Sequence, residues 1–149
     1  MIENSKNYHA PMHSAEHILN QTMVRKFDIE RSFSNHIEKK KSKCDYHFSR
    51  NLSDDEIEEI ENKVNEIITQ NLDITQEILN FEEASQIVDL SKFENETKEK
   101  IRIIKIGNYD ACACSGEHVK NTSEIGKFKI TTTTYEGEVL RIRYKLVND

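Results

Sequence analysis

Two pairs of side chains that commonly bind metal ions occur at the same spacing in distant parts of the sequence. His13 and His17 are four residues apart, and Cys114 and His118 repeat that spacing. On a helix, four residues place two side chains on one face, because one turn takes 3.6 residues. Zinc binds imidazole nitrogen and thiolate in a tetrahedral shell, and this donor set suits zinc better than magnesium or calcium. We therefore predict that the two pairs meet around one Zn²⁺ ion.

Two glutamates adjoin these predicted ligands and are candidates for handling a proton. Glu16 precedes His17, and Glu117 precedes His118. Either carboxylate is able to orient the neighbouring histidine or to act as a general base. An exposed surface glutamate is the simpler interpretation for both, because glutamate is mostly exposed in proteins. Both interpretations stay open at this point.

The cysteines and the lack of long apolar runs favour a reducing, aqueous compartment. The chain has three cysteines, and this odd count with a tight Cys112-x-Cys114 pair is poor material for a disulfide framework. We expect Cys112 to turn away from the ligands and to be buried. No run approaches the ~18 apolar residues of a membrane span, and residues 1–10 do not resemble a secretion signal. We expect a cytoplasmic chain without a membrane partner.

The hydrophobic pattern predicts the elements that must position these residues. We expect helices at 11–27, from 53 onward and at 82–90, and strands at 31–38, 44–50, 74–79, 101–106, 127–135 and 138–147. Ser53 and Glu56 form a capping box at the start of the second helix. The sequence thus predicts an α+β fold in which a mostly antiparallel sheet packs against two principal helices. With one proline and four glycines, no linker is marked, and we expect a single domain over 1–149.

The charge is distributed unevenly along the chain. The net charge of -6 argues against nucleic acid, which binds lysine and arginine through its phosphates. Residues 53–96, however, contain 14 acidic and two basic residues, so the remainder carries 19 basic against 13 acidic. Most of this acidic block is predicted to be the solvent-exposed side of the second helix. The basic clusters outside it are either ordinary solvated surface or an anion-binding face.

At the metal-ligand pairs the sequence resembles a known family. The pairs His13-x3-His17 and Cys114-x3-His118, followed by the run 119–126, resemble the editing domain of alanyl-tRNA synthetase and its free-standing AlaX homologues. The related domain of threonyl-tRNA synthetase carries the same pairs. The resemblance covers essentially the whole chain. The synthetase pattern usually reads Cys-Gly-Gly-Thr-His, whereas the segment 114–118 reads Cys-Ser-Gly-Glu-His and is closer to the short AlaX type.

The resemblance implies hydrolysis in trans of wrongly charged tRNA, with Zn²⁺ as cofactor and the acceptor end of tRNA(Ala) as partner. The expected substrates are seryl-tRNA(Ala) and glycyl-tRNA(Ala), and the chain is not expected to charge tRNA itself. Ser34 and His36 are candidates for a pocket wall that pairs with a serine hydroxyl, because such a wall rejects substrates that leave its groups unpaired. Four points stay open: which amino acid is removed, whether the cognate tRNA is that of alanine or threonine, whether the chain is a monomer or a homodimer, and whether the zinc is catalytic or only positions the substrate.

Two other functions remain compatible with the same residues. The segment 13–17 fits the H-x-x-E-H pattern of inverted zincin peptidases, with Glu16 as base and Glu94 or Glu96 as third ligand. That interpretation gives Cys114 and His118 no role. Alternatively, a closed four-ligand zinc site holds together an RNA-binding module that performs no chemistry.

Overall fold

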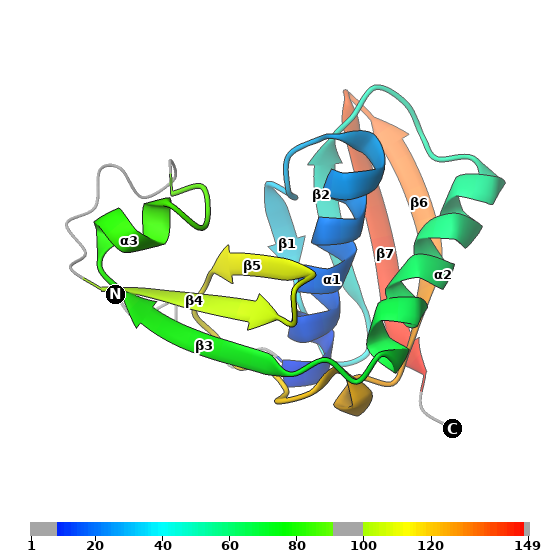
Figure 1. The fold of residues 1–149 in the computed structure, drawn as a ribbon. Helices are drawn as coiled ribbons and strands as arrows, with labels where there is room; N and C mark the ends of the chain where they lie inside the picture. Colours follow the sequence, from blue (N-terminus) through cyan, green and yellow to red (C-terminus); the bar gives the residue numbers. More distant parts are fainter. Residues whose placement is uncertain (1–8, 91–99, 148–149) are drawn as a thin grey trace.

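The computed structural model describes residues 9–90 and 100–147. Its helices are α1 (Ala10–Phe27), α2 (Asp54–Thr69), α3 (Phe81–Ser85) and the short 3-10 helix η3 (Thr122–Glu124). Its strands are β1 (Ser34–His36), β2 (Ser42–His47), β3 (Ile74–Leu79), β4 (Ile101–Ile106), β5 (Asp110–Ala113), β6 (Lys127–Glu136) and β7 (Val139–Val147). The strands form two antiparallel sheets, ordered β1-β2-β7-β6 and β3-β4-β5 (Figure 1).

Helix α1 lies between the two sheets and is buried on two faces (Figure 1). Its apolar face joins the main core with the inward side chains of β2, β6 and β7. The residues of this apolar face are Met12, Ala15, Ile18, Leu19 and Met23. A second stripe, formed by His13, Glu16, His17 and Asn20, is polar and equally buried. Because buried polar side chains require partners, this stripe must be satisfied by the neighbouring elements.

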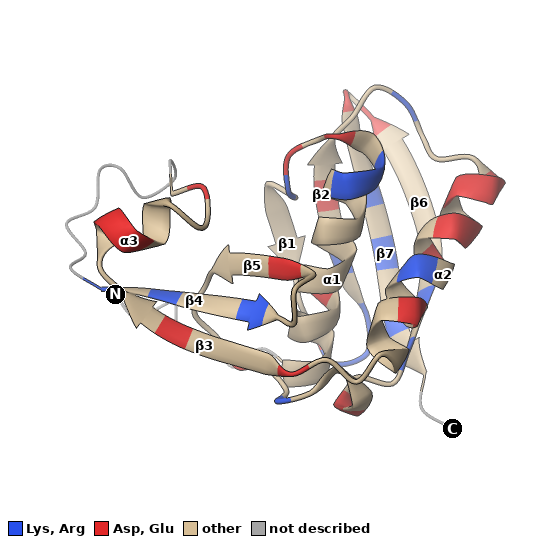
Figure 2. Cartoon of the chain, in the orientation of Figure 1, with Lys and Arg blue, Asp and Glu red and all other residues tan. Residues whose placement is uncertain are grey.

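Helix α2 covers the core side of the four-stranded sheet next to α1 (Figure 1). Ser53 and Glu56 form the expected capping box at its start. Its buried residues repeat at helical spacing, and the exposed face is acidic (Figure 2). These apolar residues are Ile60, Val64, Ile67 and Ile68.

Thr122 ties the chain after the second ligand pair to the end of α2. Its fully buried hydroxyl donates to the Ile68 carbonyl and accepts from the Leu72 backbone N–H, each at 2.9 Å. The two backbone groups belong to the end of a helix and the turn after it, where internal partners are missing. Together with the backbone bonds from Thr122 N–H to the Leu72 carbonyl and from Ile74 N–H to the Lys120 carbonyl, this side chain holds the segment after His118 against the turn that follows α2.

The α+β class is confirmed, and several element bounds agree with the prediction. The strands at 74–79 and 101–106 lie where the sequence placed them, whereas the short third helix ends at Ser85 rather than near 90. β5 was missed, because four residues around Cys112 carry too little pattern. The division into two sheets was also not predicted, since it depends on α1 lying between them. Within the described ranges, no helix is long and apolar enough to cross a membrane.

We predict that Thr122→Val lowers the free energy of unfolding by about 1–3 kcal/mol, because two buried backbone groups lose their partner. Thr131→Val, at an exposed position of β6, is the matched control and should change it by less than about 0.5 kcal/mol. Denaturant titration of the two variants measures both effects. Equal midpoints for the two variants would contradict the role given to Thr122.

Candidate metal centre

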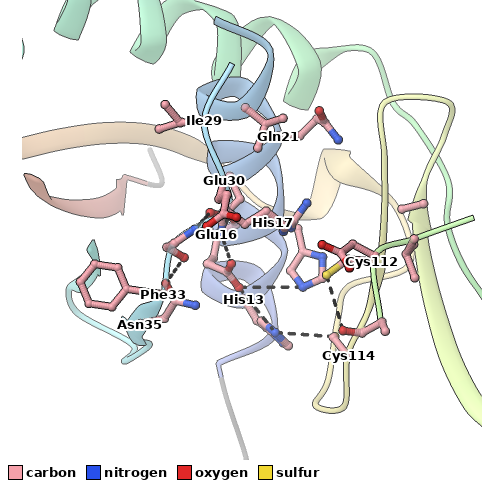
Figure 3. A pocket seen from close by; sticks show the side chains of 18 of the residues that line it. His13, Glu16, His17, Gln21, Ile29, Glu30, Phe33, Asn35, Cys112 and Cys114 are labelled. Carbon is pink, nitrogen blue, oxygen red and sulfur yellow. Dashed lines mark hydrogen bonds and ion pairs between the residues drawn. The ribbon is translucent and has the colours of Figure 1, made fainter. Parts of the chain in front are cut away.

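Three imidazoles and one thiol converge where α1 meets the loop between β5 and η3. One ligand atom from each of His13, His17, Cys114 and His118 lies within 4.8 Å of all the others. The rings of His13 and His118 stack with centroids 4.0 Å apart, and the His17 ring meets both edge-on. Figure 3 shows His13, His17 and Cys114 turned toward the same part of a cavity. The structure thus brings the two sequence pairs together.

The spacing and the donor types of this cluster fit a zinc ion. Cys114 Sγ lies 3.3 Å from His118 Nε2 and 3.9 Å from His13 Nε2. In a tetrahedral zinc site with bonds of about 2.0 Å to nitrogen and 2.3 Å to sulfur, neighbouring ligand atoms are separated by roughly 3.3–3.6 Å. Small side-chain shifts would therefore suffice to bind an ion. Nitrogen and thiolate donors favour zinc over magnesium or calcium.

The outer nitrogens of two histidines are held by groups that leave their Nε2 atoms facing inward. His13 Nδ1 donates to the Glu117 carbonyl oxygen at 3.0 Å. His118 Nδ1 donates to Ser14 Oγ at 3.0 Å, and that hydroxyl also accepts from the Val119 N–H at 3.2 Å. Metal-binding histidines usually donate their second N–H in this way, which fixes the tautomer and the ring orientation. The contacts therefore prepare both rings as ligands.

His17 is supported by a buried carboxylate. Its Nδ1 lies 3.5 Å from Asp110 Oδ2, an ion-pair distance that is longer than a good hydrogen bond. Asp110 is itself held by Arg31 Nη1 at 2.7 Å and by Gln21 Nε2 at 2.8 Å. Burial raises the pKa of Asp110, but the nearby charges of His17 and Arg31 and the hydrogen bond from Arg31 hold it well below its usual range. The carboxylate therefore stays ionised beside the cluster.

The three imidazoles differ in their affinity for a proton. Burial and then the charge of His17 lower the pKa of His13 to about 3, and the same causes lower the pKa of His118 strongly. Burial also opposes protonation of His17, but the carboxylates of Glu16 and Asp110 outweigh it and raise the pKa of His17. Without an ion, His17 is thus the imidazole of the three that binds a proton most readily. A ligating imidazole must be neutral, so an ion would displace that proton.

Glu16 is a buried residue of the site and not an exposed helical glutamate. Its side chain is in the polar stripe of α1 and the residue is 6% exposed. Oε1 lies 3.8 Å from Nε2 of both His13 and His17. Asn20 donates to the other carboxylate oxygen, while its own Oδ1 accepts from the Ser32 N–H at 2.7 Å. The carboxylate is therefore fixed beside the atoms that would face an ion.

The cluster borders a cavity of about 710 Å³. Its walls come from α1, the 29–37 segment, the turn after α3 and β5, and Figure 3 shows many of these side chains. Volumes of this size are typical of small-molecule sites. The cluster thus lies at a site that a substrate is able to enter.

The other candidates from the sequence lie elsewhere. The Glu117 side chain is exposed, and the residue contributes its carbonyl oxygen to His13. Ser34 and His36 do not line the cavity, because they pair with Asp45 and Lys43 on the outer face of the sheet. The pocket-wall prediction is corrected accordingly: alternation turns their neighbours, Phe33, Asn35 and Ile37, to the cavity.

Cys112 also requires a correction. Cys112 was expected to turn away from the ligands and to be buried, but it lines the same cavity as Cys114, because residues two apart in an extended chain share a face. The residue is half-buried. It is not part of the four-residue cluster, as expected. Burial raises the pKa of its thiol.

Sequence reasoning missed Asn20, Ser14 and Asp110 as parts of the site. A signal for the first two was present, because Glu16 is the only Asp, Glu, Lys or Arg between residues 10 and 24. A solvated helix face would normally carry more charges. Asp110 had no comparable signal, since it reaches His17 only through the packing of β5 on α1.

The peptidase interpretation leaves part of this arrangement unexplained. His13, Glu16 and His17 do lie together, but Cys114 and His118 complete the cluster that a peptidase would leave without a role. Glu94 and Glu96, its suggested third ligands, lie outside the described residues.

Comparison with known proteins finds chains of similar sequence. Residues 101–143 match the family model described as the threonyl and alanyl tRNA synthetase second additional domain. The chain is similar to an alanine-tRNA ligase of Fervidobacterium nodosum, with 33% identity over 121 residues, which are 80% of this chain and 14% of the relative.

Two further relatives carry the same name. An alanine-tRNA ligase of Thermoanaerobacter sp. strain X514 is 31% identical over 138 residues, covering 92% of this chain and 16% of the relative. That of Clostridioides difficile is 37% identical over 79 residues, covering 53% and 9%. The chain therefore spans less than a fifth of the length of these relatives.

We predict that Cys114→Ala greatly reduces zinc binding, because the cluster loses its only sulfur ligand. Cys112→Ala is the matched control, since Cys112 lines the same cavity outside the cluster. Zinc content after dialysis, measured by atomic emission, should stay near one per chain for the control. Equal loss in both variants, or in neither, would contradict the assignment.

Proposed function

Because the chain belongs to the family of the second additional domain of threonyl- and alanyl-tRNA synthetases, we propose that it is a deacylase of mischarged tRNA. The proposed substrates are seryl-tRNA(Ala) and glycyl-tRNA(Ala), since the similar chains are alanine-tRNA ligases. The observation that carries the proposal is the three-histidine, one-cysteine cluster beside a buried carboxylate at a substrate-sized cavity.

Hydrolysis of an aminoacyl ester requires few catalytic groups from a protein. The ester is already activated, so the site must position a water and stabilise the negative charge that develops on the carbonyl oxygen. A divalent ion held by His13, His17, Cys114 and His118 would supply Lewis acidity toward that oxygen. The remaining tasks belong to the protein groups around it.

Glu16 is the proposed general base. Its carboxylate would take a proton from the attacking water as the water oxygen bonds to the carbonyl carbon. The carbon–oxygen bond to the ribose then breaks, and the proton passes to the ribose oxygen. Asn20 holds the carboxylate in place through its hydrogen bond. Glu117, whose side chain is exposed, is proposed only to orient His13 through its carbonyl oxygen.

An enzyme fits the surroundings of the cluster better than a zinc-stapled binding module. A purely structural zinc site has no need of an adjoining cavity or of a carboxylate beside its ligands. Here the buried Glu16 carboxylate lies 3.8 Å from two ligand nitrogens, and both ligand pairs contribute to the cavity wall. Keeping a carboxylate buried is costly, which favours a chemical role for it.

The outer face of the four-stranded sheet supports tRNA as the partner. Alternation places on that face the basic residues Lys43, Lys127, Lys129, Arg141, Arg143 and Lys145, which we call the basic sheet face. Figure 2 shows basic residues along β7, in contrast to the acidic α2. Asp45 lies among them and is paired with Lys43 and Arg141. A basic face of this kind would bind the phosphates of a duplex without reading its sequence.

We predict that the zinc-loaded protein hydrolyses seryl-tRNA(Ala), that a chelator abolishes the activity, and that alanyl-tRNA(Ala) is spared. Glu16→Gln should lower kcat by about 10²-fold or more, because a general base is removed. Release of labelled amino acid measures each effect, with glycyl- and threonyl-tRNAs as further substrates. Failure of the zinc-loaded protein to release any amino acid would refute the proposed function.

We also predict that Lys129→Glu combined with Lys145→Glu weakens tRNA binding and makes it less sensitive to salt. Each lost phosphate contact should reduce the slope of log K against log salt by about one unit. Lys63→Glu on α2 is the control, because it changes charge away from the basic sheet face. Equal effects of Lys63→Glu and the double variant would contradict this binding face.

A further inference from the structure

Exposed apolar side chains gather at the cavity that the metal-ligand cluster borders. Among the residues that the structure describes, three large hydrophobic side chains are exposed: Phe33, Ile78 and Ile87. Phe33 and Ile87, each 43% exposed, both line this cavity. Exposed apolar surface that collects at a cavity indicates an apolar surface on the molecule that binds there.

Phe33 is held in a defined orientation. Its backbone N–H donates to the Asp45 carbonyl oxygen at 3.0 Å, just before β1 begins. Its ring stacks on the imidazole of His47, with centroids 4.1 Å apart and planes inclined by 13°. An aromatic ring supported in this way is presented to the cavity with little conformational freedom left to lose on binding.

The ring lies well away from the reactive end of the cavity. Figure 3 shows Phe33 on the side opposite Cys112 and Cys114, with Glu16 and His13 between them. An ester bound at the cluster would therefore leave the ring to contact another part of the substrate. A small amino acid such as serine is too short to occupy both ends of a cavity of about 710 Å³.

The charges of the cavity wall indicate which part of the substrate contacts Phe33. The wall carries the carboxylates of Glu16, Glu30 and Asp89, and its one arginine, Arg31, is paired with Asp110. Away from the metal-ligand cluster, such a wall disfavours phosphate groups. A neutral, flat, aromatic group fits better, and a nucleobase stacks on aromatic side chains whatever its sequence.

We propose that Phe33 is a stacking platform for the nucleobase of the terminal nucleotide, the one whose ribose carries the aminoacyl ester. This inference rests on the proposed deacylase function. The cluster holds the ester and Phe33 holds the base, so the ribose between them is placed with its ester bond at Glu16. Ile87 adds an apolar contact from the turn after α3.

The test compares the seryl ester of adenosine with the seryl ester of ribose that lacks a base. Phe33→Ala should raise KM for the adenosine ester about tenfold with little change in kcat, because a stacked base is lost from binding. The base-free ester should be cleaved equally by both proteins. Phe33→Trp should restore KM, and Ile78→Ala, which removes an exposed side chain outside the cavity, is the matched control.

Titration with adenosine alone, followed by NMR, separates the two hypotheses. The stacking platform is supported if adenosine binds to the wild type and to Ile78→Ala but not to Phe33→Ala. This holds even when neither ester is cleaved, because a lack of cleavage would refute only the deacylase function. Cleavage of the adenosine ester with the same KM in wild type and Phe33→Ala would refute the stacking platform and leave the deacylase intact. Equal loss of binding in both alanine variants would also refute it.

Discussion

The site depends on the hydrogen bonds that join α1 to the loop after β5. Ser14 Oγ accepts from His118 Nδ1 and from the Val119 N–H, and His13 Nδ1 donates to the Glu117 carbonyl oxygen. These contacts link segments more than a hundred positions apart, and Ser14 is fully buried. Because they fix both the loop and the rings, they stabilise the fold and orient the ligands at once. A loop held in any other place would leave each ligand pair without its partner.

A second constraint on the site is the electrostatic cost of burying its charged side chains. Burying several imidazoles and carboxylates together is costly unless each charge meets an opposite charge or a hydrogen-bond donor. Asp110 accepts hydrogen bonds from Arg31 and Gln21 and faces His17. The Glu16 carboxylate accepts a hydrogen bond from Asn20. A bound divalent ion would add positive charge beside the carboxylates of Glu16 and Asp110. The polar stripe of α1 thus tolerates burial because β5 and the 31–32 segment supply its partners.

The sequence predicted the parts of this arrangement that are local. The four-residue spacings, the capping box at Ser53 and the strands at 74–79 and 101–106 each follow from neighbouring residues, and the structure agrees with them. The convergence of the two ligand pairs was expected from their chemistry and from the family resemblance. The pocket wall was predicted on the wrong side of a strand, because the face of a three-residue strand is set by its register with β2. The role of Asp110 depends on how two sheets enclose α1, and no short-range pattern records that.

The proposed chemistry requires that His13, His17, Cys114 and His118 bind one metal ion together. X-ray absorption spectroscopy at the zinc edge of the zinc-loaded protein tests it most directly, because it counts sulfur and nitrogen neighbours without any assay of activity. We expect one sulfur at about 2.3 Å and three nitrogens at about 2.0–2.1 Å. A shell without sulfur, or one built from oxygen ligands alone, would contradict it.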